Sequence, residues 1–212
     1  MRIAHFALAG LIAAASLPAH AGSTIFSENF SGAVPGYGYT GHIGGTQFDV
    51  TTADVDVVGV TNGSFFTCSD NPAGNCLDLV GGHGAGGITS TTKLGLVAGD
   101  TYTVHFGARL QGFNAGQGST TFSVGLGSLS QVETLVGGIN TAYSLVFKPL
   151  ANQIGAALSF DTIIPGDQVH GAVIDNISIV QSAPAVSTPE PAALALLAFG
   201  ATGLATARRR SR

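Results

Sequence analysis

Residues 101–110 alternate between two kinds of side chain, and this alternation constrains the fold more than any other feature of the chain. Apolar side chains occupy the even positions, and polar side chains occupy most of the odd ones. Successive side chains of a β-strand point to opposite faces of a sheet, so Tyr102, Val104 and Phe106 share one face. His105 and Arg109 fall on the other. The segment is therefore predicted to be a strand with one face in a core and one face in solvent.

The same period of two recurs elsewhere and favours an all-β fold. Alternating runs cover residues 122–126, 143–147 and 154–160, each bounded by Gly, Asn, Pro or Asp. Further strands are expected within residues 46–60, 76–80, 88–93 and 173–180, and no stretch of the body has a long helical period. We therefore expect an antiparallel β-sandwich of roughly eight to ten strands over about 165 residues.

Two glycine-rich segments, residues 81–87 and 112–118, are expected to form loops or a hairpin tip. A loop that cradles a phosphate is followed by the N-terminus of a helix, whereas β-like Thr, Ser and apolar residues follow these segments. They therefore give no support to nucleotide binding.

The first 21 residues have the pattern of a secretory signal peptide. Arg2 gives a positive start, residues 3–17 are almost wholly apolar, and Ala19 and Ala21 place small residues where signal peptidase cuts. A buried N-terminal helix is the alternative. We expect cleavage after Ala21, which leaves a β-sandwich domain at residues 22–181.

An uncharged apolar run, residues 192–207, is followed directly by a cluster of arginines. As a helix the run is about 24 Å long, slightly shorter than the hydrocarbon core of a bilayer, so it predicts a short transmembrane helix. The positive-inside rule leaves the arginines in the cytoplasm and the body outside the inner membrane. Residues 182–188 are mostly small and are expected to form a linker.

The charge of the chain is unevenly distributed. The formal net charge is −4, but five of the eight basic residues lie in the two terminal segments. The body keeps Lys93, Arg109 and Lys148 against eleven acids, a net charge of −8. A body this acidic has no basic surface for nucleic acid, which we therefore exclude as a partner.

The two cysteines, Cys68 and Cys76, enclose a turn-rich segment and lie outside the membrane in this topology. An oxidising compartment and this short spacing favour a disulfide. Two cysteines alone make a poor metal site, and a pair of reduced buried thiols is the other alternative.

The C-terminal segment, residues 189–212, resembles the PEP-CTERM sorting signal of Gram-negative, exopolysaccharide-producing bacteria. Its parts are the tripeptide motif, the apolar run and the basic cluster: Pro189, Glu190, Pro191, residues 192–207, Arg208, Arg209 and Arg210. The resemblance implies that an exosortase cuts at or near the motif. The protein would be anchored transiently in the inner membrane with its body in the periplasm, then reach the cell surface or the extracellular matrix. An ordinary tail anchor with a proline-rich stalk is the alternative.

Short segments of the body resemble secreted galactose-binding-like and carbohydrate-binding jelly rolls: residues 26–30, 76–79, 96–104 and 173–179. In that fold the first and last strands are commonly neighbours, and many members hold a structural calcium ion there. The resemblance thus implies a jelly roll with Glu28 and Asp175 as calcium ligands, joined by backbone carbonyls, because Ca²⁺ takes six to eight oxygens. The alternative is that Asp175 caps a strand or turn and binds no metal.

The residues of the body do not favour an enzyme. Its histidines are scattered, and no serine is framed by glycines as in a nucleophile elbow. A secreted glycan hydrolase with paired carboxyl groups is therefore the least favoured function.

Glycan binding and a purely structural role both remain. Sugar rings stack on exposed aromatic side chains; the body has no Trp, and the candidate ligand contacts are Tyr37, Tyr39, His105 and Arg109. We favour a structural or adhesive protein of the cell surface or exopolysaccharide matrix. An extracellular glycan-binding module with a structural calcium is the second interpretation.

Overall fold

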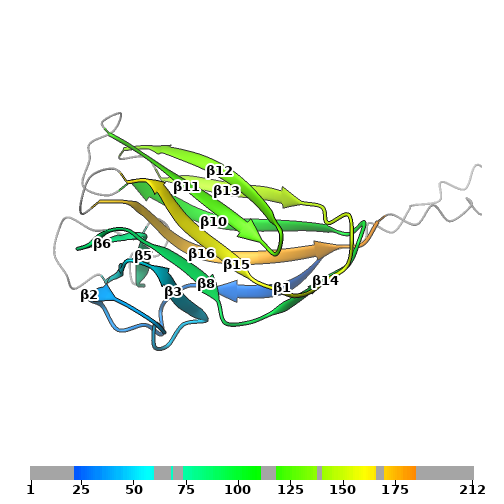
Figure 1. The fold of residues 1–212 in the computed structure, drawn as a ribbon, viewed down its shortest axis with the longest axis horizontal. Coiled ribbons are helices and arrows are strands. Elements are labelled where there is room, and N and C mark those ends of the chain that lie inside the picture. The colour runs from blue at the N-terminus through cyan, green and yellow to red at the C-terminus, as the bar shows by residue number, and fades with distance from the viewer. Residues whose placement is uncertain are drawn as a thin grey trace, which may run out of the picture. The chain divides into compact units, whose positions relative to one another are not determined.

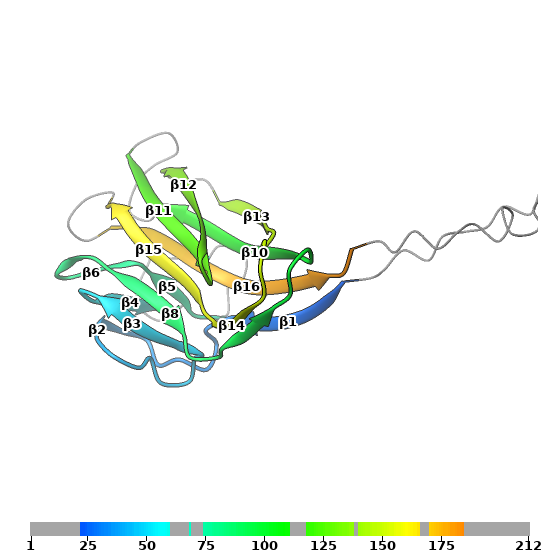
Figure 2. The same ribbon diagram turned by 45° about the vertical axis from the view of Figure 1, so that its right-hand side comes forward.

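In the computed structural model, two antiparallel sheets pack face to face (Figures 1 and 2). The structure describes residues 22–59, 68, 74–110, 118–137, 140–165 and 170–184, which belong to one unit, Ala21–Pro184. The predicted signal peptide, transmembrane segment and sorting motif lie outside these residues. Among the described residues, no helix is both long and apolar enough to cross a bilayer.

Sheet A is the larger of the two sheets. Its strands are β1 (Ser23–Glu28), β2 (Gly36–Tyr39), β4 (Val55–Val58), β5 (Cys76–Asp78), β10 (Thr101–Leu110), β13 (Thr141–Phe147) and β16 (Ala172–Ser182). Their spatial order is β13-β10-β16-β5-β4-β2, and β1 also pairs with β16. The last strand of the body therefore lies in the middle of sheet A.

Sheet B covers the inner face of sheet A. Its strands are β3 (Phe48–Thr52), β8 (Gly87–Ser90), β11 (Ser119–Leu126), β12 (Leu129–Val136) and β15 (Leu158–Ile164). Two small pairs complete the fold: β6 (Val80–Gly81) with β7 (Gly84–Ala85), and β9 (Leu94–Leu96) with β14 (Gln153–Ala156). The chain passes repeatedly from one sheet to the other, and the predicted all-β antiparallel jelly-roll sandwich is confirmed.

The predicted alternation of residues 101–110 matches the burial of their side chains. The even-numbered side chains of β10 are buried between the sheets, while Thr103, His105 and Arg109 are only partly buried. Phe106 contacts aromatic rings from both sheets, so the alternating strand supplies the centre of the core.

Two local predictions have clear outcomes. Of the glycine-rich residues 81–87, Gly82 and His83 form the expected hairpin tip between β6 and β7, whereas Gly87 begins β8. Residues 154–160, in contrast, are not one alternating strand. Ala157 separates β14 from β15, Gly155 within β14 has a φ of +75°, and Ile154, which we expected in the core, is fully exposed. Glycine reaches positive φ without a steric penalty, so the chain can change direction there.

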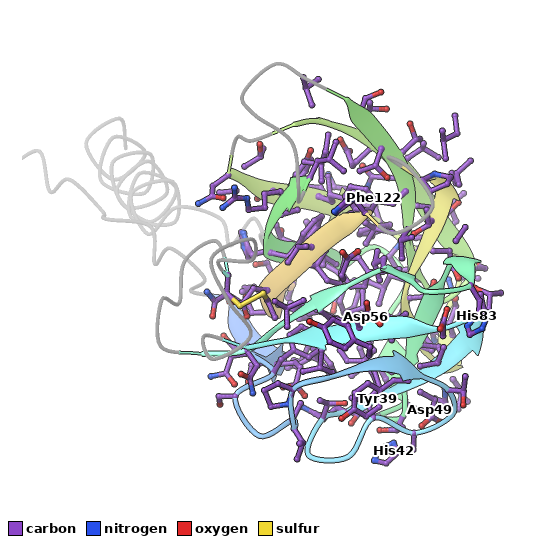
Figure 3. All side chains as sticks on the ribbon, turned by 90° about the vertical axis from the view of Figure 1, so that its left-hand side faces the viewer. Tyr39, His42, Asp49, Asp56, His83 and Phe122 are labelled. Carbon is purple, nitrogen blue, oxygen red and sulfur yellow. A yellow bond between two sulfur atoms is a disulfide. The ribbon has the colours of Figure 1, made fainter. Side chains whose placement is uncertain are left out.

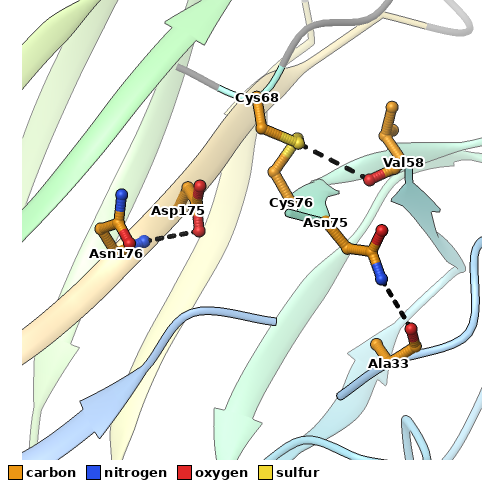
Figure 4. The surroundings of a disulfide bond; sticks show 7 residues. All are labelled: Ala33, Val58, Cys68, Asn75, Cys76, Asp175 and Asn176. Atoms are coloured by element: carbon orange, nitrogen blue, oxygen red, sulfur yellow. Dashed lines mark hydrogen bonds between the residues drawn. A yellow bond between two sulfur atoms is a disulfide. The ribbon is translucent and has the colours of Figure 1, made fainter. Parts of the chain in front are cut away.

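The predicted disulfide is confirmed: Cys68 and Cys76 are bonded, with their Cα atoms 5.4 Å apart (Figure 4). Cys76 begins β5, and the pair packs with Val58 and Val173 in a small cluster separate from the main core. The bond therefore attaches the segment before β5 to sheet A.

Candidate functional site

A polar pocket of about 290 Å³ lies where β1 ends beside β16. Its lining comes from three distant parts of the chain: Ser27, Glu28, Asn29, Gln47, Asn176 and Ile177. Five of these six side chains are polar, and among them Glu28 carries the charge. We call this cavity the β1–β16 pocket.

Glu28 holds the wall of the β1–β16 pocket in place. Its Oε1 accepts hydrogen bonds from the backbone N–H groups of Asn29 at 3.0 Å and Phe30 at 2.8 Å. Its Oε2 accepts one from the backbone N–H of Gln47 at 2.8 Å. These bonds join the end of β1 to the residues that follow it and to Gln47, directly before β3. The Glu28 carboxylate therefore holds the local backbone in place as well as lining the pocket.

Both polar atoms of the Gln47 side-chain amide are hydrogen-bonded. Its Nε2 donates to the carbonyl of Ser27 at 2.7 Å, and its Oε1 accepts from the hydroxyl of Thr92 at 2.8 Å. Such a side chain presents a pre-organised surface, since its rotamer is already restricted before any ligand arrives.

Asn176 reaches the pocket because of a β-bulge in β16. His105 pairs with Ser178, but Gly107 pairs with Asp175, so β16 has an extra residue at this point. Asn176 adopts a φ of +50°, a left-handed conformation that Asn tolerates better than most residues. The bulge leaves the Asn176 side chain exposed while both neighbours, Asp175 and Ile177, are buried.

The first and last strands, β1 and β16, are neighbours as expected, but Glu28 and Asp175 lie in different surroundings. Glu28 pairs with Ile177 and lines the pocket, whereas Asp175 pairs with Gly107 and is fully buried. Asp175 Oδ1 accepts from the backbone N–H of Asn176 at 2.7 Å (Figure 4). Within the described ranges, no three His, Cys, Asp or Glu side chains form a metal-binding group. The described side chains thus supply only a partial ligand set, and calcium stays a prediction.

The four predicted ligand contacts do not form one compact site. His105 and Arg109 lie on the outer face of sheet A, on either side of Gly107. Tyr37 is exposed on β2, and the three strands between β10 and β2 separate them by about 19 Å. The Tyr39 hydroxyl donates to the carbonyl of Val34 at 2.6 Å and its ring packs on the core, so Tyr39 is mainly structural.

A His–Asp pair at the tip of the β6–β7 hairpin was not predicted. His83, which is labelled in Figure 3, has its Nδ1 2.7 Å from Asp54 Oδ2, and its backbone N–H donates to Asp54 Oδ1 at 3.0 Å. The two residues are 29 positions apart and share no motif, so only the fold brings them together. A similar exposed pair joins His42 Nδ1 to Asp49 Oδ1 at 2.8 Å.

Pairing shifts the pKa values of both Asp54 and His83. Burial alone would raise the pKa of Asp54, but the hydrogen bonds and charge of His83 outweigh it, and the pKa of Asp54 is lowered. The hydrogen bond to Asp54, with its negative charge, raises the pKa of His83. The side chain of His83 is 84% exposed, so water surrounds the imidazole and screens its attraction to the buried Asp54.

We expect the ion pair to stabilise the fold most between about pH 4 and pH 6.5. The raised pKa of His83 means that its contribution is complete below its ordinary value of 6.5 and is lost as pH rises through the folded value. The lowered pKa of Asp54 means that its contribution is present above 3.8 and is lost as pH falls through the folded value. An NMR titration should therefore give a His83 pKa above 6.5 that falls in Asp54→Asn. Equal values in the two proteins would contradict the pairing.

Comparisons with known proteins give similarity only at the level of solved structures. No protein-family model matches the chain, and no curated protein does either. The CBM22-1 xylan-binding domain of Paenibacillus barcinonensis Xyn10C is 14% identical, with 79% of this chain and 99% of that one covered and a TM-score of 0.46. The K3 cleaved adhesin domain of Lys-gingipain from Porphyromonas gingivalis is 12% identical, with coverages of 74% and 99% and a TM-score of 0.49.

A third similar structure contains the CBM22-1 and GH10 modules of Clostridium thermocellum xylanase 10B. It is 16% identical, the match covers 79% of this chain and the TM-score is 0.46. This chain spans only 30% of that one. At such identities and scores, the similarities transfer no ligand to this chain.

Proposed function

We propose that the β-sandwich is a glycan-binding module of an exported cell-surface or exopolysaccharide-matrix protein. The observation that carries the proposal is the polar lining of the β1–β16 pocket. Its amide, hydroxyl and carboxylate groups match a ligand with many hydroxyl groups, because each can exchange a hydrogen bond with water for one with the ligand. The fixed amide of Gln47 lowers the entropy that binding costs.

The charge of the body favours a neutral glycan. With a net charge of −8 and Glu28 in the pocket wall, an acidic polysaccharide would be repelled at low salt. A neutral sugar hydroxyl, in contrast, can donate to the carboxylate and accept from an amide. We therefore expect the preferred ligand to lack carboxylate and sulfate groups.

The second candidate is a structural or adhesive matrix component with no defined ligand. The described residues that line the pocket include no aromatic side chain, and this favours the second candidate, since aromatic stacking is a common source of affinity for sugars. Both candidates share the same proposed route. Signal peptidase removes the leader, the apolar tail anchors the chain transiently in the inner membrane, and an exosortase cuts near Pro189, Glu190 and Pro191.

Glycan binding through the pocket predicts that Asn176→Gly weakens binding about tenfold, the effect of one lost hydrogen bond at the strong end of the usual range. Glycine keeps the positive φ of position 176, so the bulge should survive without the amide. The full chain, in detergent, would be screened on an array of neutral oligosaccharides, and the dissociation constant of the best one measured for each variant.

Tyr37→Ala is the matched control, because it removes an exposed aromatic side chain on the edge of sheet A and should leave binding unchanged. If Tyr37→Ala abolishes binding and Asn176→Gly does not, the site lies at the edge strand β2 and the pocket assignment is wrong. If no glycan binds, the structural role replaces the proposed one.

A further inference from the structure

Three large aliphatic side chains are exposed on neighbouring segments at one end of the sandwich. Val97 is 48% exposed, Leu150 is 97% exposed and Ile154 is fully exposed. None of them is needed by the pocket or the core. We call Val97, Leu150 and Ile154 the tip patch.

Hydrogen bonds hold the segments that carry the tip patch together. The backbone N–H of Gly99 donates to the carbonyl of Pro149 at 3.1 Å, and that of Ala98 donates to Asn152 Oδ1 at 2.8 Å. Gln153 pairs with Leu96 between β14 and β9. The apolar side chains therefore project from a bonded framework rather than from separate loops.

The tip differs in charge from the rest of the body. Within the described segments 94–100 and 148–156, the charged residues are Lys148 and Asp100. Asp100 is buried and its Oδ2 accepts from Gln181 Nε2 at 2.7 Å, whereas Lys148 is exposed. A body with a net charge of −8 thus presents no exposed acid on these segments, so an apolar surface can cover them without desolvating a carboxylate.

The chain leaves the sandwich beside the tip patch. Ser182, the last residue of β16, pairs with Thr101 at the start of β10, and Gly99 lies against Pro184. In Figure 1 the end of β16 and β14 are at the same end of the sandwich. Seven residues, 185–191, then separate Pro184 from the apolar run at 192–207, and seven residues span at most about 25 Å.

We propose that the tip patch rests on the lipid bilayer while the C-terminal apolar run spans it. This inference rests on the membrane-anchored step of the proposed function. Three aliphatic side chains give a weak membrane contact by themselves, but a tether this short holds them at a high effective concentration near the lipid. The contact is therefore made while the tail is attached and is lost once the chain is cut, which lets the sandwich leave the membrane.

The sequence offers a sensitive test because it contains no Trp. Leu150→Trp in the full chain introduces a single indole at the tip. In phosphatidylcholine and phosphatidylglycerol vesicles, its emission should shift to shorter wavelength and be quenched by lipids with brominated acyl chains. Val136→Trp is the control, since Val136 is exposed at the opposite end of β12 from the turn that bonds Gln153. Its emission should stay that of an indole in water.

Vesicle flotation separates failure of this inference from failure of the proposed function. A full chain that does not float with the vesicles overturns the membrane-anchored step itself. A chain that floats, but whose Leu150→Trp emission equals that of Val136→Trp, keeps its anchor and overturns the tip contact. A short-wavelength emission that is already present without lipid would show that protein covers the patch, either the apolar run of the same chain or a second copy, and would also overturn the proposal.

Discussion

Replacing Phe106 with alanine is expected to lower the free energy of unfolding by about 3–5 kcal/mol. Phe106 is buried on β10 and contacts three aromatic rings from three other strands. The ring centroids of Tyr143, Phe160 and Phe122 lie at 4.9, 5.2 and 6.0 Å. Tyr143 belongs to sheet A and the two phenylalanines to sheet B, so the ring joins the two layers. Its removal leaves a cavity that neither sheet can fill without moving against its partner.

Urea unfolding of the wild type and of Phe106→Ala measures this loss directly. Val146→Ala is the control: Val146 lies on β13 but is half exposed on the outer face, and its loss should stay within about 0.5 kcal/mol. Phe106→Leu should fall between the two, because it keeps part of the buried volume. A loss below about 1 kcal/mol in Phe106→Ala would mean that the sheets do not meet at this ring.

Loss of the disulfide should have the second largest effect. The double variant Cys68→Ala with Cys76→Ala is expected to be about 2.5 kcal/mol less stable, the chain-entropy value for a loop this short. For a domain of this size the melting temperature should fall by about 5–10 °C. Alanine is preferred to serine because Val58 and Val173 surround the sulfur atoms, and a hydroxyl group there would be poorly satisfied.

Thermal unfolding with and without a thiol reductant checks the disulfide prediction and supplies its own control. Reductant should lower the melting temperature of the wild type towards that of the double variant, and should leave the double variant unchanged. The oxidised wild type, the reduced wild type and the double variant could instead share one melting temperature. The disulfide would then make no contribution to the stability of the fold, contrary to the prediction.

The sequence predicts the central strands well because their burial requires an alternation of apolar and polar side chains. β10 begins and ends where its alternation does, since a central strand must bury every second side chain. The edge strand β12 was missed for the opposite reason. Val132 and Val136 face solvent there, while the half-buried Gln131 donates to the carbonyl of Val146 on the other sheet. Edge strands often carry polar side chains inward, which removes the apolar signal.

The candidate site was only partly accessible to sequence reasoning. Glu28 was selected through a family resemblance, but Gln47 and Asn176 reach the same pocket from segments that no local spacing connects. An Asp-Asn pair inside a β-rich run was the one available signal, because Asn disfavours strands and tolerates the left-handed conformation of a bulge. Tyr39 was predicted to contact a glycan because it has an aromatic ring. Its hydrogen bond to the carbonyl of Val34 shows that its role is mainly structural.

The position of β16 in sheet A also has a mechanical consequence. The strand is bonded to β10 along one side and to β1 and β5 along the other, and its end is the point where the chain continues towards its C-terminus. A pull transmitted through that end acts along the strand, at right angles to its hydrogen bonds, so many bonds share the load at once. A sandwich held by this end would resist stretching and flow better than one whose C-terminal strand lay at an edge and could be peeled away bond by bond.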